Sequence, residues 1–404
     1  MKMKVGQGNF SVARRRSAGF TTIRAMSLPE PSADALAASR ALERLIREAI
    51  RANDDWIPFS RYMELALYAK DLGYYAGGSA KLGKDGDFTT APEITPLFGA
   101  TLALFAAELF GAQPLRILEF GAGTGKLAGD MLRALSERGV VVASYQIVEL
   151  SGELRARQQR VLSAYPQVSW LDAPPGTFSG FVVANEVLDA MPVPLLVRQA
   201  GRWLERGVAL QGDRFVFADR ECAPALAAQI PDADDLPDGY LTEVHVQQTG
   251  FIRMLADMLC TGNGGIAALI DYGFPAHEYY LPQRAQGTLM CHYRHHAHAD
   301  PFYLPGLQDI TAHVDFTAIA RASLDAGLAL AGYQSQAGFL LAAGLPELLR
   351  AESPDDPARW LPIANAVQKL TSPAEMGELF KVMLLSHQIS LPERFRLQDR
   401  SHRL

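Results

Sequence analysis

The sequence predicts an α/β fold: a doubly wound, mostly parallel sheet with an N-terminal helical extension and an inserted antiparallel meander. Between residues 115 and 186, short apolar runs alternate with helical patterns, which is typical of parallel strands joined by crossover helices. Strand-like sequence with turn signals near Gly201 and Gly212 interrupts this alternation at 195–219. Before the first strand, apolar residues recur at helical spacing from 33 to 52.

The composition is that of a globular chain with a large core, because 49% of its 404 residues are hydrophobic. The three cysteines show no CxxC spacing, so the sequence indicates neither a disulfide framework nor a zinc knuckle, and we expect a reducing compartment. The longest uncharged stretch, 326–346, carries polar residues and glycines at its middle. We therefore expect a buried strand and turn there, and no stable membrane insertion.

Charge is distributed unevenly along the chain. The net charge is −6, yet residues 1–26 contain no acidic side chain and several basic ones: Lys2, Lys4, Arg14, Arg15, Arg16 and Arg24. This leader is interpreted as a disordered tail or a non-native extension upstream of Met26, with a mitochondrial presequence as the third option. The acidic remainder predicts no nucleic-acid partner, since phosphate binding needs a basic surface. We expect a cytoplasmic bacterial protein, or a mitochondrial-matrix protein if the leader is a genuine presequence.

The elements follow in order along the chain. The N-terminal region is expected to hold helices at 33–52, 60–69 and 96–110, with a Gly-rich loop before the last of them. The predicted strands of the sheet domain are 115–120, 144–150, 180–186, 264–273, 328–334 and 379–386. The predicted helices beyond residue 110 are 126–139, 151–165, 248–261 and 316–326, and more than one helix is expected within 345–370. Residues 274–314 are expected to be a long connection.

These elements divide the chain into five parts. They are a leader at 1–32, an N-terminal helical region with a covering loop at 33–110, a core at 111–194 and 262–390, an inserted strand and helix subdomain at 195–261, and a tail at 391–404.

A glycine-rich segment, ILEFGAGTGKL at 117–127, joins the first strand to the helix after it. Backbone N–H groups converge on one point in such a turn, and glycine lets a ligand approach the chain closely. A dinucleotide fingerprint would need Gly or Ala at Lys126, and a P-loop would need Ser or Thr at Leu127. The remaining pattern, Glu119, Gly121, Gly123 and Gly125, resembles the S-adenosylmethionine site of class I methyltransferases.

Acidic residues after the next strands are expected to complete this site. Glu149 ends the second strand, where a carboxylate can accept both ribose hydroxyls of an adenosine, and Leu150 beside it is assigned to the same site. Asp172 follows a probable third strand and is expected to take the adenine amino group. Glu119 or Glu186 is expected to meet the methionine ammonium of the ligand.

The loop before 96–110 is interpreted as a cover over the cofactor. Its segment GDFTT supplies Asp87, Thr89 and Thr90 as polar contacts, with a structural turn as the alternative. Tyr74 and Tyr75 line the pocket or, equally, pack between the first helices and the sheet.

Several segments together resemble one family, the MidA family. They are 86–99, 118–132, 148–158, 184–193, 271–273, 287–296 and 309–316. The resemblance spans about residues 35–390 and implies a Rossmann-like class I methyltransferase fold with S-adenosyl-L-methionine as cofactor. Mitochondrial members of the family assist respiratory complex I assembly, which implies a protein substrate such as a respiratory-complex subunit, methylated on arginine. A homodimer is left open.

Carboxylates beyond two strand ends are expected to handle the methyl acceptor. A guanidinium, with a pKa of about 12.5–13.8, has no free lone pair at neutral pH, but carboxylates that bind two of its nitrogens leave the third nucleophilic. Asn185, expected at the cofactor, leads into Glu186 and Asp189, and Asp271 ends a neighbouring strand. For Asp189, a helix N-terminal charge is the alternative. His295, by family position, is expected to contact substrate or act as a base.

Histidines gather at 292–298, but no HExxH motif or cysteine pair accompanies them, so no metal site is predicted. Two other functions stay open at this point: a cofactor-binding assembly factor or scaffold with little or no turnover, and a small-molecule methyltransferase.

Overall fold

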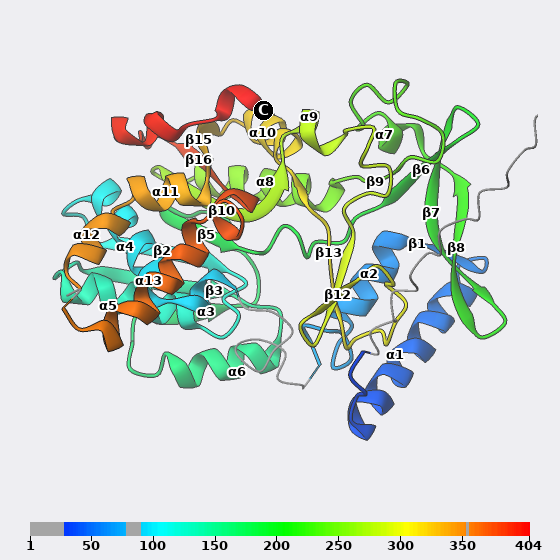
Figure 1. The fold of residues 1–404 in the computed structure, drawn as a ribbon, viewed down its shortest axis with the longest axis horizontal. Coiled ribbons are helices and arrows are strands. Elements are labelled where there is room, and N and C mark those ends of the chain that lie inside the picture. The colour runs from blue at the N-terminus through cyan, green and yellow to red at the C-terminus, as the bar shows by residue number, and fades with distance from the viewer. Residues whose placement is uncertain (1–27, 78–89, 353–354) are drawn as a thin grey trace, which may run out of the picture.

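The computed structural model describes residues 28–77, 90–352 and 355–404 (Figure 1). Residues 1–27 of the predicted leader, together with Asp87 and Thr89, therefore lie outside the described residues. In the described ranges, no helix combines the length and the apolar character needed to cross a membrane.

The described residues form a central eight-stranded sheet in the order β15-β16-β10-β5-β2-β3-β4, with β14 paired to β10. Its strands are β2 (Leu115–Phe120), β3 (Val142–Val148), β4 (Val168–Leu171), β5 (Gly180–Asn185), β10 (Gly265–Phe274), β14 (Val314–Asp315), β15 (Ala329–Ser335) and β16 (Phe380–His387). Neighbours from β4 to β10 are parallel, whereas β16 runs antiparallel to β10 and β15. The predicted doubly wound, mostly parallel sheet is confirmed.

Helices cover both faces of this sheet (Figure 1). They include α4 (Pro96–Phe110), α5 (Lys126–Glu137), α6 (Gly152–Val161), α8 (Val246–Cys260), α10 (Phe316–Asp325) and α11 (Gln336–Ala342). Alternate residues of one strand belong to two separate buried clusters, as Ile117 and Leu118 of β2 do, because successive side chains point to opposite faces. Burial on both faces explains the nearly continuous apolar strands of the sequence.

A second sheet joins the N-terminal region to the inserted segment. The five strands are β1 (Trp56–Pro58), β6 (Leu195–Gln199), β7 (Arg202–Gln211), β8 (Arg214–Glu221) and β9 (Leu241–Glu243). The meander is confirmed in β6 to β8, but the sequence did not reveal β1, which pairs with β7. A Cβ on Gly207 would lie 2.3 Å from the ring of Trp56, so glycine is required for this close pairing.

The N-terminal helices pack on this second sheet. They are α1 (Ala33–Arg51), whose N-terminus Ser32 caps, and α2 (Phe59–Tyr68). Phe59 and Tyr62 share a buried cluster with Val208 of β7. The first helices of the region predicted at 33–110 therefore share a core with strands of the region predicted at 195–261. By contrast, α4 and α8 pack in the clusters on the central sheet.

Two other segments differ from the expected arrangement. The connection at 274–314 holds α9 (Ala276–Tyr279) and a small sheet of β11 (Met290–Tyr293), β12 (His296–His298) and β13 (Asp309–Thr311). The helices predicted within 345–370 are α12 (Leu345–Arg350) and α13 (Pro357–Thr371). The predicted tail folds as two 3-10 helices, η1 (Glu393–Gln398) and η2 (Ser401–Arg403), with Phe395 buried in the core. The short helices are α3 (Ala91–Ile94), α7 (Pro224–Ala227) and α14 (Met376–Leu379).

Candidate functional site

The glycine-rich loop lies between β2 and α5, as predicted. Gly121, Gly123 and Gly125 have φ values of +64°, +52° and +83°, in the left-handed region that side chains disfavour. Gly125 is the N-cap residue of α5, and a Cβ there would lie 3.3 Å from Cγ of Gln158. The alternating glycines are thus required by the backbone path, which leaves main chain rather than side chains at the ligand-facing turn.

Glu149 follows β3 beside this loop. Its carboxylate accepts hydrogen bonds from the Ser151 backbone N–H and from Nε2 of Gln158, each at 2.9 Å. The same Nε2 donates to the carbonyl oxygen of Gly123 at 3.0 Å, so Gln158 ties the carboxylate to the glycine loop. Burial raises the pKa of Glu149. The sequence did not reveal Gln158, since a glutamine in a helix made mostly of polar residues carries no distinctive signal, although this side chain is buried.

Leu150 and Asp172 lie next to Glu149, at the ends of β3 and β4. The Leu150 side chain is 78% exposed, which suits an apolar contact with a ligand ring rather than a core position. Asp172 is exposed and forms an ion pair with Arg155. Both predicted residues therefore share one edge of the site with Glu149.

Glu119 lies deeper than the loop. It is 2% exposed, and the Tyr145 hydroxyl donates a hydrogen bond to its Oε2 at 2.7 Å. Burial raises the pKa of Glu119 to about 8, although the bond from Tyr145 opposes this. Its carboxylate is thus bonded to a core side chain.

Glu186 and Asp189 occupy the turn that follows β5. Glu186 has a φ of +53°, and its N–H donates to the Ile270 carbonyl of β10 at 2.9 Å. Asn185 donates from Nδ2 to Oε1 of Glu186 at 3.1 Å. Burial, together with the charge of Asp189, raises the pKa of Glu186 to about 8, and burial raises that of Asp189 to about 6. A non-glycine residue in this conformation is strained, which is common at functional sites.

Asp271 holds this turn in place. Its Oδ2 accepts hydrogen bonds from the Leu188 and Asp189 N–H groups at 2.9 and 3.2 Å, and its Oδ1 accepts from Tyr272 N–H at 2.9 Å. The side chain is 1% exposed. Burial, and next the charge of Asp189, raise the pKa of Asp271. The carboxylate predicted to be catalytic is therefore engaged with backbone donors, as a clamp on the turn.

A fourth carboxylate, Asp309 of β13, closes the cluster from the other side. The Tyr75 hydroxyl lies 3.0 Å from both Asp309 oxygens, and Tyr75 stacks on Tyr68 with ring centroids 5.6 Å apart. Tyr68 donates to the Ala190 carbonyl at 2.9 Å. The charge of Asp309 also contributes to the raised pKa of Glu186. The sequence left Tyr75 open between a pocket position and packing of the first helices on the sheet, and it did not identify Asp309 or Tyr68.

Two buried acceptor atoms of this cluster, Oδ1 of Asn185 and Oδ1 of Asp189, have no hydrogen-bond partner in the described ranges. Within the same ranges no lysine or arginine forms an ion pair with Glu186, Asp189 or Asp271. An unsatisfied buried polar atom costs about 1–3 kcal/mol, and more when charged. The arrangement is therefore suited to a cationic ligand that carries several N–H donors. The described residues include no group of three or more metal-ligating side chains placed to hold an ion.

His295 and Thr90 stand apart from these contacts. His295 is exposed, with a φ of +65°, in the turn between β11 and β12. In the described part of the chain, no hydrogen bond or ion pair joins it to the carboxylates, so its predicted role stays a prediction. Thr90 directly precedes α3 in an extended conformation.

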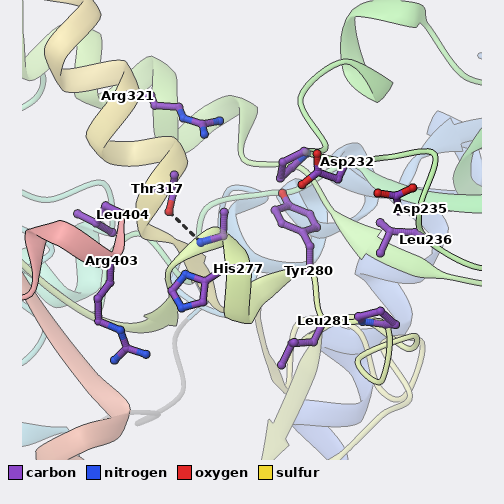
Figure 2. Close-up of a pocket in the computed structure, with 13 residues that line it drawn as sticks. Asp232, Asp235, Leu236, His277, Tyr280, Leu281, Thr317, Arg321, Arg403 and Leu404 are labelled. Carbon is purple, nitrogen blue, oxygen red and sulfur yellow. Dashed lines mark hydrogen bonds between the residues drawn. The ribbon is translucent and has the colours of Figure 1, made fainter.

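A pocket of about 500 Å³ lies elsewhere, between α9, α10 and the inserted segment (Figure 2). Its polar lining residues include Asp232, Asp235, His277, Tyr280, Arg321 and Arg403. Because the lining contains none of the predicted site residues, this hollow is separate from the strand-end site.

Known proteins resemble this chain over most of its length. A family model described as "Putative S-adenosyl-L-methionine-dependent methyltransferase" matches residues 101–334. The mitochondrial protein arginine methyltransferase NDUFAF7 of Bos taurus is 29% identical over 388 residues, with 86% of this chain and 82% of the relative covered. Its Danio rerio counterpart is 28% identical, covering 85% of this chain and 86% of the relative.

A solved structure from Burkholderia thailandensis, bound to S-adenosyl-homocysteine, is 53% identical and has a TM-score of 0.88. The match covers 94% of this chain and 100% of that one. Together with the glycine loop at the strand ends, these similarities confirm the family and the cofactor that the motifs predicted. The chain belongs to the MidA family of S-adenosylmethionine-dependent methyltransferases.

Proposed function

We propose that this protein transfers a methyl group from S-adenosylmethionine to an arginine side chain of a partner protein. The observation that carries the proposal is the cluster of Glu186, Asp189 and Asp309 beside Asn185. In it, Oδ1 of Asn185 and Oδ1 of Asp189 are buried acceptor atoms that have no donor in the described ranges. The names of relatives near 28% identity, protein arginine methyltransferases, agree with it.

The residues at the glycine loop fit the cofactor. Main chain faces the ligand at three left-handed glycines, Glu149 presents a carboxylate held by neighbouring donors, and Leu150 exposes an apolar surface beside it. The Glu149 carboxylate suits a ribose diol, and the apolar surface of Leu150 suits an adenine ring. When bound, the cofactor supplies a methyl group on a positively charged sulfur, which leaves with the carbon–sulfur electron pair.

The carboxylates act on the acceptor in this proposal. Glu186 and Asp189 accept N–H bonds from two guanidinium nitrogens, which concentrates positive charge there and leaves the third nitrogen to form the new bond to carbon. A bound cation favours the charged form of Glu186, opposing the burial that raises its pKa to about 8. The methylated nitrogen then releases one proton, and a carboxyl of high pKa is well suited to accept it. Asp271 keeps both side chains in position through its bonds to the turn.

Methyl labelling tests the proposal. The purified protein is incubated with S-adenosylmethionine carrying an isotopically labelled methyl group and with extract from cells that lack this protein. Peptide mass spectrometry then locates the label. We expect label on arginine, and none with the double variant Glu186→Gln, Asp189→Asn, although that variant still binds S-adenosyl-homocysteine.

Other outcomes would contradict the arginine assignment. Label on lysine, asparagine or glutamine would assign a different acceptor, and label confined to metabolites would identify a small-molecule methyltransferase. Cofactor binding without transfer to any component would favour the assembly-factor role. A respiratory-complex subunit as the labelled protein would extend to this chain the partner that the resemblance implies.

A further inference from the structure

The methionine end of the cofactor needs a partner for its ammonium group, and the order of the strands shows where that end lies. Glu149 and Leu150 follow β3, and Asp172 follows β4, so the adenosine side of the site is at that edge. The sheet order continues from β3 through β2 to β5. The rest of the ligand must therefore run across the glycine loop of β2 toward Asn185 and Glu186.

The short helix α3 spans this path. Oε1 of Glu93 accepts a hydrogen bond from the Thr124 hydroxyl at 2.5 Å, and Thr124 lies between two glycines of the loop. At the other end of the path, the Ala91 backbone forms a hydrogen bond to the Glu186 carboxylate. Glu93 is thus held beside the loop, on the side of the loop that leads to β5.

Glu93 also has a carboxylate oxygen that is available to a cation. The side chain is half-buried, and no described residue forms a hydrogen bond or an ion pair with its Oε2. Lys126, the first residue of the helix after the loop, forms an ion pair with Asp130 at 2.5 Å. A half-buried carboxylate without a counter-charge favours binding of an ammonium group.

The two acids that the sequence suggested for this task are engaged elsewhere. Glu119 is 2% exposed and bonded to Tyr145. Glu186 is bonded to Asn185 and lies against Asp189 in the acceptor cluster.

We propose that Glu93 binds the ammonium group of the cofactor's methionine end, with the Thr124 hydroxyl fixing the orientation of the carboxylate. Glu93 is a binding residue in this assignment, and the assignment does not depend on which molecule accepts the methyl group.

Calorimetry with two ligands tests it on the full chain. S-adenosyl-homocysteine carries the amino-acid end, whereas 5′-methylthioadenosine has the same nucleoside and sulfur without it. Glu93→Gln keeps the bond from Thr124 but removes the charge. We expect this variant to bind S-adenosyl-homocysteine roughly tenfold to a hundredfold more weakly. Its affinity for methylthioadenosine should stay within about twofold of that of the wild type, which also shows that the site is folded.

Thr124→Val is the complementary control, because it removes the hydrogen bond that Glu93→Gln keeps and leaves the Glu93 charge in place. It should cost less affinity for S-adenosyl-homocysteine than Glu93→Gln does. Equal weakening of both ligands by Glu93→Gln, no weakening of either, or an identical selective loss in Thr124→Val would overturn the assignment. Competition against S-adenosyl-homocysteine replaces direct titration if methylthioadenosine binds weakly.

Discussion

At the scale of single residues, the site contains buried carboxylates whose pKa values are raised by burial. Glu119 has an ordinary pKa of 4.5 in the unfolded chain and about 8 in the fold, because burial penalises the charged form. Between these pH values the native state binds a proton that the unfolded chain has released. The free energy of unfolding therefore falls as pH rises from about 4.5 to about 8, since the native state must either keep that proton or bury a charge.

Replacing Glu119 by glutamine should remove this dependence. The amide is neutral at every pH and still accepts the bond from Tyr145. We expect the stability of Glu119→Gln relative to the wild type to increase by roughly 2–4 kcal/mol between pH 4.5 and pH 8. Urea denaturation of both proteins at both pH values measures this difference in unfolding free energy. The exposed Glu153→Gln should show no such change, and a parallel pH profile for Glu119→Gln and wild type would mean that Glu119 is ionised in the fold.

At the scale of elements, the turn after β5 is held by its neighbour β10. The Ile270 carbonyl and the Asp271 carboxylate together bind three backbone N–H groups of that turn, which includes the strained Glu186. The turn that carries Glu186 and Asp189, the residues that we propose bind the acceptor, is thus held by a strand that follows it by about 80 residues in the chain.

Asp271 variants should separate clamping from direct chemistry. Asp271→Ala leaves buried donors without a partner, so we expect the free energy of unfolding to fall by roughly 3–5 kcal/mol. Methyl transfer should also be lost. At low temperature, where the destabilised variant stays folded, it should still bind S-adenosyl-homocysteine at the separate glycine loop. Asp271→Asn keeps an acceptor oxygen and should retain part of both stability and activity. Full stability with no activity in Asp271→Asn would instead indicate that the charge acts on the substrate.

At the scale of the whole molecule, the site is where three parts of the chain meet. The central sheet supplies the glycine loop and Glu186, the N-terminal region supplies Tyr68 and Tyr75, and the small sheet supplies Asp309. Figure 1 shows α2 and the β12–β13 segment side by side, next to the central sheet. The glycine loop that we assign to the cofactor belongs to the central sheet, so a ligand that binds only the folded sheet should raise the free energy of unfolding.

Ligand-induced stabilisation gives the corresponding prediction. At a concentration of S-adenosyl-homocysteine one hundred times the Kd, the wild type should gain about 2.7 kcal/mol. Gly123→Val should gain nothing, since a side chain at φ +52° displaces the loop that approaches the ligand. Gly139→Val is the matched control, with φ +69° and no atom near its Cβ. The Gly139→Val variant has a similar backbone strain and should keep the ligand-induced rise in Tm. An equal rise in both variants would place the ligand away from Gly123.

The sequence by itself determined the parallel sheet, the glycine loop and the acids at the strand ends, because each depends on local spacing that the chain displays directly. The order in which strands pair, and hence the contact of Glu93 with Thr124, of Tyr75 with Asp309, and of β1 with β7, was decided only by the tertiary structure. Those contacts join residues far apart in the chain, and their partners are ordinary polar side chains. Asp271 shows the difference: its position at a strand end was predictable, but its role as a clamp depends on which N–H groups the packed turn directs at it.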